Sequence, residues 1–270
     1  MKLYASITVI GRDQSGVIAK VTGFLFLQRA NIEGLEEKVT RGQFGMTVQA
    51  SWEANDCDVE HIKDGLTRLG RELGMEIKIR FVEPSRLQRF AILVTKETHC
   101  LEAIMAAVKK KELKAEPVIV IGNHPDLEPL ARQHKLPYVH IPWHDRNKAE
   151  ARTLRLLEKH EIDFVVLARF MKILSPTFVW HYKNKIINIH PSLLPAFTGL
   201  HTHQRAIDAG CKFAGCTVHQ VTAELDVGPI LDQAVVPVLP GDTAATLAAR
   251  VLTQEHVVYP RAVAQLLSKM

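Results

Sequence analysis

Three side chains in the last third of the sequence could together act on a carbonyl group. Asn188 and His190 lie two residues apart in the segment NIHPSLLPAFTG, and Asp226 lies in a turn before Gly228. An amide can donate to an oxyanion, an imidazole can share in that stabilisation and donate a proton, and a carboxylate can orient the imidazole and position or deprotonate water. Each residue alone has an equally ordinary structural role, so this chemistry depends on the fold bringing the three together.

The spacing of Asn188 and His190 predicts how they are presented. Residues two apart on a strand project to the same side of the sheet. Pro191 and Pro195 follow and would stop the strand just beyond them. We therefore expect a strand end that offers an amide and an imidazole to a ligand. His219 lies on another apolar strand, and there we expect a core residue.

The elements that must position these side chains lie in a predicted domain of residues 85–270. Short apolar segments, RFAILVT, EPVIVIGN, LPYVHIP, IDFVVLA and NKIINIH, alternate with helical patterns. This alternation is typical of an α/β domain whose sheet is mostly parallel and covered on both faces. Such a sheet binds its ligand beyond the carboxyl ends of its strands, where Asn188 and His190 are expected. Two further strands, FAGCTVHQV and GPILDQAVVPV, and a closing helix over residues 244–267 complete the domain.

A smaller domain is predicted for residues 1–84. Its pattern is strand, helix, strand, strand, helix, strand, with the two middle strands meeting at a turn that contains Gly42. This order is the ferredoxin-like βαββαβ arrangement. Pro84 and Ser85 punctuate a short linker to the larger domain.

Composition and charge argue against several other classes of protein. The hydrophobic fraction is 47%, and no apolar run approaches the roughly 18 residues of a membrane span. The net charge of +5 arises from basic residues scattered among acids, which argues against a nucleic-acid partner. The four cysteines have no CxxC spacing, so we expect reduced thiols in a cytoplasmic protein. The histidines lack a convincing ligand spacing, and no metal site is predicted, although His201 and His203 could line the ligand pocket.

Two segments together resemble a known family. NIHPSLLPAFTG and GCTVHQVTAELDVGPILDQ are similar to the paired signature of the formyl transferase and hydrolase fold that uses 10-formyltetrahydrofolate. The resemblance implies catalytic roles for Asn188, His190 and Asp226, the folate as substrate, and no tightly bound cofactor. LARFMKILSP resembles the folate-pocket segment of this family. The substrate-binding residues that the resemblance implies are Phe170, Met171, Lys172, Ile173, Leu174, Gly199, Glu224, Leu225 and Gly228.

The N-terminal domain has a resemblance of its own. GRDQSGVIAKVTGFLFLQRANI is similar to the start of an ACT domain, which implies a homo-oligomer and a small amino-acid effector. The effector-binding residues implied are Asp13, Gly16, Val17 and Asn31, although a helix-start turn without a ligand explains the same loop. An ACT domain fused ahead of the larger fold is the arrangement of the formyltetrahydrofolate deformylases. This implies hydrolysis to formate and tetrahydrofolate, with formate supplied to purine biosynthesis.

A glycinamide ribonucleotide transformylase is the nearest alternative. Such an enzyme must hold a ribose phosphate, normally on a glycine-rich turn after the first strand of this fold. The corresponding segment here, VTKETHCLEAI, has no glycine, and Glu97 would repel phosphate. In the other direction, Pro191 occupies the position where deformylases usually carry a second histidine, and the run that follows is more similar to transformylases.

Two further alternatives belong to other classes. A methionyl-tRNA formyltransferase would need an additional RNA-binding domain, for which the sequence after the closing helix has no room. A non-catalytic sensor would read an amino acid with the ACT domain and merely bind folate with the larger one. Loss of Asn188, His190 or Asp226 would have favoured the sensor, and all three are present.

Overall fold

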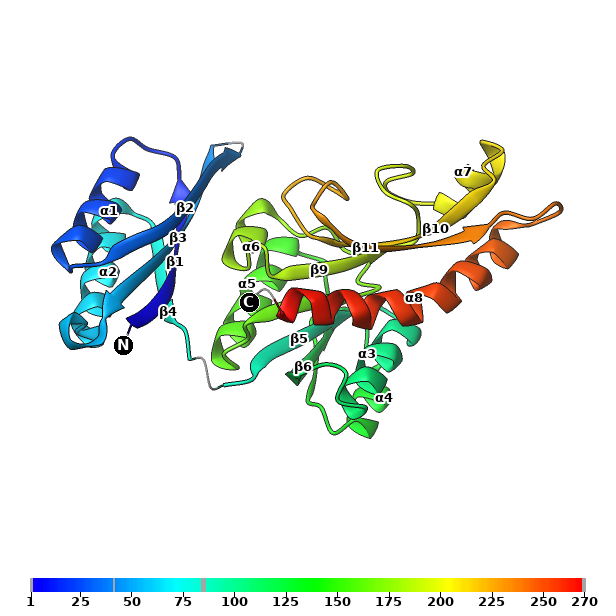
Figure 1. The fold of residues 1–270 in the computed structure, drawn as a ribbon, viewed down its shortest axis with the longest axis horizontal. Helices are drawn as coiled ribbons and strands as arrows, with labels where there is room; N and C mark the ends of the chain where they lie inside the picture. The colour runs from blue at the N-terminus through cyan, green and yellow to red at the C-terminus, as the bar shows by residue number, and fades with distance from the viewer. Residues whose placement is uncertain (1, 41, 84–85, 269–270) are drawn as a thin grey trace. The chain divides into compact units, whose positions relative to one another are not determined.

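The computed structural model describes residues 2–40, 42–83 and 86–268. The chain divides into two compact units (Figure 1). The first comprises Met1–Arg86 and Ser175–His181, and the second comprises Leu87–Leu174 and Tyr182–Met270. The predicted linker at Pro84 and Ser85 lies outside the described residues. Among the described helices, none combines the length and apolar character that crossing a bilayer requires.

The first unit has the predicted βαββαβ order. Its sheet is antiparallel, with strand order β2-β3-β1-β4. The apolar residues of α1 recur at helical spacing, so Val17, Val21 and Leu25 all turn into the core. The elements are β1 (Lys2–Arg12), α1 (Val17–Leu27), β2 (Asn31–Thr40), β3 (Gln43–Glu53), the short η1 (Ala54–Asp56), α2 (Val59–Leu73) and β4 (Glu76–Phe81).

A short helix from later in the chain also belongs to the first unit. Helix α6 (Pro176–His181) packs against β1 and β3. Gly45 of β3 makes room for it, because a Cβ at this position would lie 2.2 Å from the ring of Trp180. The imidazole Nε2 of His181 lies 2.9 Å from a carboxylate oxygen of Glu76.

The second unit is built on a seven-stranded sheet with the order β11-β10-β9-β8-β5-β6-β7. The strands from β9 to β7 are parallel, and β10 is antiparallel to both of its neighbours. The mostly parallel sheet expected from the apolar segments is therefore confirmed. The strands are β5 (Gln88–Val94), β6 (Ala115–Gly122), β7 (Tyr138–His140), β8 (Phe164–Ala168), β9 (Ile186–His190), β10 (Phe213–Gln220) and β11 (Ile230–Pro237).

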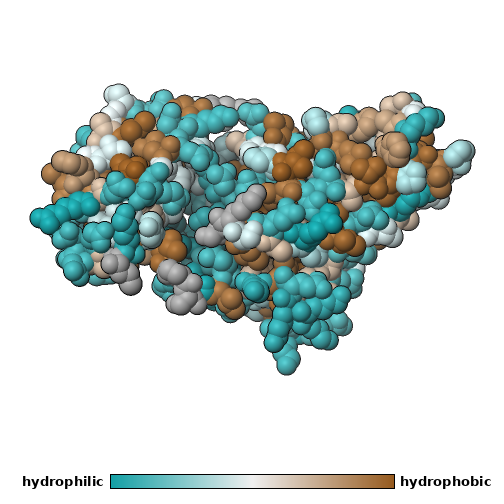
Figure 2. All heavy atoms as spheres, in the orientation of Figure 1, coloured by the Kyte–Doolittle hydropathy of each residue, from teal (hydrophilic) through white to brown (hydrophobic). Residues whose placement is uncertain are grey.

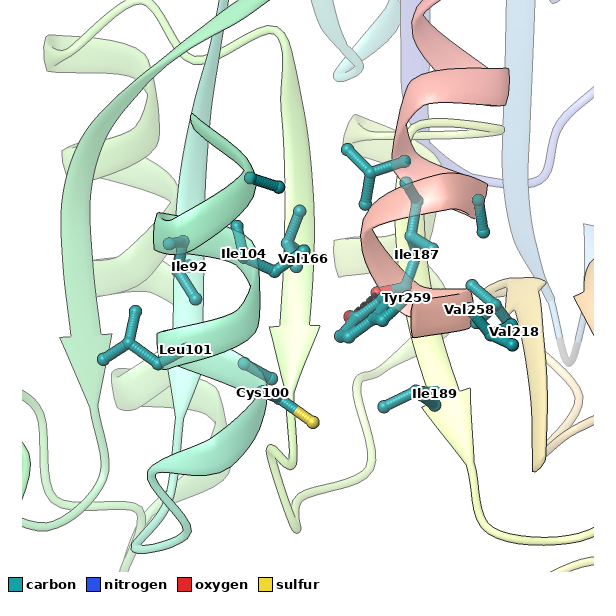
Figure 3. Packing of buried hydrophobic residues seen from close by; sticks show 14 of the residues in the cluster. Ile92, Cys100, Leu101, Ile104, Val166, Ile187, Ile189, Val218, Val258 and Tyr259 are labelled. Atoms are coloured by element: carbon teal, nitrogen blue, oxygen red, sulfur yellow. Dashed lines mark hydrogen bonds between the residues drawn. The ribbon is translucent and has the colours of Figure 1, made fainter. Parts of the chain in front are cut away.

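Helices α3 and α8 share one hydrophobic core with this sheet. Figure 3 shows Tyr259 of α8 beside Ile187 of β9, with Cys100 and Leu101 of α3 across the same cluster. The fully buried Tyr259 hydroxyl lies 2.8 Å from the carbonyl oxygen of Leu167 in β8. The helices of this unit are α3 (His99–Lys109), α4 (Glu128–Gln133), α5 (Arg146–Lys159), α7 (Thr202–Asp208) and α8 (Ala244–Leu267).

Candidate active site

A cavity of about 410 Å³ lies at the carboxyl ends of β8 and β9. Asn188 and His190 line it from β9, and Asp226 lines it from the loop between β10 and β11. The fold thus brings to one cavity the three side chains that the sequence singled out. This edge of the sheet is where parallel α/β folds bind their ligands.

His190 is held by two oxygen atoms. Its side chain is 7% exposed, and its Nε2 donates a hydrogen bond of 3.0 Å to the carbonyl oxygen of Phe197. Because a carbonyl can only accept, this contact requires a proton on Nε2. The Nδ1 atom then faces Asp226, with 3.5 Å between it and the nearer carboxylate oxygen. Protonation of Nδ1 would therefore create a charged pair inside the cavity.

Asp226 occupies a constrained turn. Its φ is 56°, a left-handed value that aspartate adopts more readily than most residues but still at a cost. One carboxylate oxygen accepts a hydrogen bond of 2.9 Å from the backbone N–H of Gly199. The other oxygen lies 3.8 Å from Nε2 of His219. The carboxylate is 6% exposed and lies next to both imidazoles.

Asn188 is oriented by His219. The antiparallel register of β9 and β10 sets these two residues opposite each other. The Asn188 amide nitrogen donates to Nε2 of His219 at 3.2 Å, and Nδ1 of His219 donates to the carbonyl oxygen of Gln220 at 3.0 Å. Both contacts fit one neutral tautomer of His219. Burial lowers the pKa of His219 and favours that neutral form.

Most of the predicted folate-binding residues line the same cavity. Thr95 helps to hold their segment, because its hydroxyl accepts a hydrogen bond of 2.9 Å from the Met171 backbone N–H. Gly228 does not line the cavity; a Cβ there would lie 1.8 Å from the Gln220 carbonyl oxygen, so its role is a close backbone approach. The predicted residues that do line the cavity are Phe170, Met171, Lys172, Ile173, Leu174, Gly199, Glu224 and Leu225.

Several cavity residues were not expected from the sequence. Arg169 lies within LARFMKILSP, the segment that resembles the folate pocket, but it was not among the individual residues predicted to bind the substrate. His219 was expected in the core, and it is indeed 2% exposed, but it also contacts Asn188. His201 and His203, which the sequence suggested as pocket residues, also line the cavity. The other lining residues that were not predicted are Leu167, Ile189, Pro191, Leu200, Thr202, Val221, Thr222 and Ala223.

The predicted effector residues of the first unit lie in two places. Asp13, Gly16 and Val17 line a cavity of about 460 Å³ at the start of α1. Gly16 has φ of 84°, which glycine adopts without strain. Asn31 does not line this cavity; its amide donates to Glu33 at 2.9 Å on β2.

One group of metal-ligand types occurs within the described residues. Ligand atoms of His99, Cys100 and Glu255 lie within 4.8 Å of one another. The Glu255 carboxylate already has a partner, because His99 Nε2 lies 2.9 Å from it. Burial raises the pKa of the Cys100 thiol, and two of the three groups lie at the start of α3, where the helix dipole disfavours a cation. We interpret the group as a buried histidine–glutamate pair beside a thiol.

Comparisons with known proteins found a matching family for each of the two units. Residues 88–263 match the formyl transferase family, and residues 4–80 match the ACT domain family. The chain is 39% identical over 263 residues to the formyltetrahydrofolate deformylase of Mycobacterium bovis. That alignment covers 93% of this chain and 82% of the relative.

Solved structures show the same relationship. A formyltetrahydrofolate deformylase from Pseudomonas syringae has a TM-score of 0.66 and 31% identity, and covers 100% of this chain and 91% of its own. A phosphoribosylglycinamide formyltransferase from Brucella melitensis has a TM-score of 0.64 and 42% identity. That match takes in 98% of the transferase but only 68% of this chain. The similarity to the deformylase thus extends over a larger part of this chain.

Proposed function

The chain belongs to the formyltetrahydrofolate deformylases of the formyl transferase family, and we propose that it hydrolyses 10-formyltetrahydrofolate to formate and tetrahydrofolate. The observation that carries this proposal is the meeting of Asn188, His190 and Asp226 in one cavity. The ACT match at residues 4–80 supports a deformylase in particular, because the relatives with that name align with this chain almost throughout.

The attack of water on the formyl carbon is the first chemical step. Asp226 holds the water and accepts one of its protons as the new carbon–oxygen bond forms. The formyl oxygen becomes an oxyanion, to which the Asn188 amide donates and which His190 also stabilises once the proton from water has passed to it from Asp226. A preorganised donor of this kind contributes about 3–4 kcal/mol to the transition state in comparable sites. His219 keeps the Asn188 amide in place by accepting from it.

Collapse of the tetrahedral intermediate completes the reaction. The bond between the formyl carbon and the folate nitrogen breaks, and the nitrogen takes up a proton from His190 or Asp226. His190 lies 3.5 Å from Asp226, so the proton taken from water can pass between the two groups. The products are formate, which ionises, and tetrahydrofolate.

Formyl transfer to glycinamide ribonucleotide is the reaction to be distinguished. The 42% identity with the Brucella transferase supports a shared catalytic unit. The turn between β5 and α3 argues against the ribonucleotide, because residues 95–98 contain no glycine and include Glu97. Water is then the remaining nucleophile.

A formate-release assay tests the proposal. Purified protein is given 10-formyltetrahydrofolate with and without glycinamide ribonucleotide, and both formate and formylated product are measured. We expect formate in both reactions. Formyl transfer that occurs only with the amine would identify a transferase, and no turnover in either reaction would identify a folate-binding sensor.

The proposal extends to regulation and assembly. A small amino acid is the effector we propose for the cavity lined by Asp13, Gly16 and Val17. We also propose a cytoplasmic homo-oligomer, with formate passing to purine biosynthesis. Strand β2 is an outer strand of its sheet, and exposed edges favour strand pairing. Light scattering after size exclusion tests the assembly, and a monomeric mass at micromolar concentration would contradict it.

A further inference from the structure

Arg169 is an unusual member of the active-site cavity. It follows β8 directly and has φ of 57°, a left-handed conformation that a side chain with a Cβ adopts only at an energetic cost. Strain of this kind persists where the surrounding structure enforces it, and it concentrates at functional sites. The backbone therefore directs the arginine into a position that the chain does not favour locally.

The guanidinium of Arg169 lacks a partner for one of its donors. Its Nε is buried and has no hydrogen bond within the part of the chain that the structure describes. The Nε2 atom of His203, which lines the same cavity from α7, is also buried without a partner there. Buried polar atoms are nearly always satisfied in proteins. The Arg169 Nε can only donate, so it indicates a ligand with an acceptor oxygen, and His203 Nε2 can donate to the same ligand in one of its neutral tautomers.

Arg169 lies beside the reacting groups. In the parallel pairing of β8 with β9, Leu167 is opposite Asn188, so Arg169 and His190 each lie two residues beyond that pair. Arg169, His190 and His203 all line the same cavity. A ligand held by Arg169 would therefore share the cavity with the formyl group and the residues that act on it.

Hydrolysis produces an anion that formyl transfer does not. The water oxygen bonds to the formyl carbon, the carbon–nitrogen bond breaks, the nitrogen takes up the proton that the water has lost, and the resulting formic acid loses its own proton at neutral pH. The carboxylate of formate forms in the cavity that Asp226 also lines, and a cation in that cavity would offset the two negative groups. Arginine binds carboxylates through strong charge-assisted hydrogen bonds.

We propose that Arg169, with His203 beside it, binds the product formate in the active-site cavity. This inference rests on the proposed hydrolysis and adds a small-carboxylate site to it. The carboxylates of the folate tail have the same chemistry, so the test must separate the two sources.

Titration with sodium formate, without folate present, tests the site directly. Binding is measured by calorimetry and by the linewidth of carbon-labelled formate, with sodium chloride keeping the ionic strength constant. We expect Arg169→Gln to weaken formate binding about tenfold or more, as loss of a charge-assisted hydrogen bond would. Arg169→Lys keeps the charge but loses the planar guanidinium, so its affinity for formate should lie between those of the unaltered protein and Arg169→Gln.

A matched control removes a positive charge elsewhere. Arg155 is exposed on α5 and does not line the cavity, so Arg155→Gln should bind formate like the unaltered protein. Tetrahydrofolate is titrated in parallel. Its affinity should be the same in Arg169→Gln as in the unaltered protein, because the arginine is assigned to formate and not to the folate tail.

The possible results separate this inference from the proposed function. Unchanged formate affinity in folded Arg169→Gln, or a loss confined to tetrahydrofolate, overturns the formate site. If Arg169→Gln does not fold, the formate site is overturned when both Arg169→Lys and His203→Asn bind formate with the affinity of the unaltered protein. Absence of formate release by the unaltered protein contradicts the hydrolase instead.

Discussion

At the scale of single residues, the carboxylate of Asp226 connects the groups of the site. It accepts from Gly199 and lies within 3.8 Å of both His190 and His219. Its place in the turn after β10 could be anticipated from the Gly-Pro that follows it. Its left-handed φ of 56° and its hydrogen bond with Gly199 could not be predicted from the sequence, because they depend on a loop distant in sequence.

Replacing this carboxylate should separate chemistry from binding. We expect Asp226→Asn to lower kcat by about 10²–10⁴-fold, because the amide cannot accept the proton from water. Folate affinity should change little, because the binding segment 170–174 is untouched. Formate release and tetrahydrofolate titration measure the two effects. Asp64→Asn, an exposed change on α2, serves as the control, and normal turnover in Asp226→Asn would refute the role of the carboxylate.

The hydrogen bond between Asn188 and His219 predicts how kcat depends on pH. Burial lowers its pKa below the usual value of about 6.5, so it is neutral at pH 7 and can accept from Asn188. As the pH falls below that range, protonation removes the acceptor, and kcat should decrease. His219→Gln keeps an acceptor that does not titrate, so this part of the acid limb should disappear from its pH–rate profile. His219→Phe should lower kcat about tenfold at pH 7, as expected for one lost hydrogen bond. An identical acid limb in His219→Gln would argue against this role.

At the scale of elements, strand pairing determines which side chains meet, and the pattern of apolar residues in the sequence does not show this. The alternation of apolar residues predicted β9 and β10 and a buried His219. Only the antiparallel register shows that His219 lies opposite Asn188. Helix α6 is a second example. Its apolar residues Phe178, Val179 and Trp180 would suit the core of either unit, and the sequence alone does not indicate that they belong to the first.

Helix α8 holds the strands that carry the site. The Tyr259 hydroxyl lies 2.8 Å from the Leu167 carbonyl oxygen and 3.2 Å from that of Ile187, so one side chain joins β8 to β9. Tyr259→Phe removes the donor and leaves buried carbonyl oxygens short of a partner. We expect the free energy of unfolding to fall by about 1–3 kcal/mol, measured in urea. Tyr4→Phe, at an exposed position of β1, is the control, and equal urea midpoints for Tyr259→Phe and the unaltered protein would contradict the assignment.

At the scale of the whole molecule, the chain combines a catalytic unit with a unit of the ACT family. The order of elements in each could be predicted, because helix and strand periods differ and the connections are short. Figure 2 shows hydrophobic side chains on the visible surface of the first unit, and the exposed ones include Phe26 and Leu27 at the end of α1. Apolar residues of this kind would be covered in the proposed homo-oligomer.

An effector should bind the first unit through the loop before α1. We expect one or more small amino acids to raise the melting temperature of the unaltered protein, and Asp13→Ala to abolish that increase. Formate release without effector should stay the same in this variant, since Asp13 lies in the first unit and the catalytic cavity in the second. The absence of a shift with any of the amino acids, or an equal shift in Asp13→Ala, would refute the effector site.

The central claim is that Asn188, His190 and Asp226 direct water onto a formyl carbon. A single-turnover reaction in oxygen-18-labelled water, followed by mass spectrometry of the formate, tests this claim most directly. We predict one labelled oxygen in each formate molecule, and loss of the labelled product in Asp226→Asn. Formate without the label, or a formyl group recovered on an amine with none released as formate, would contradict the account.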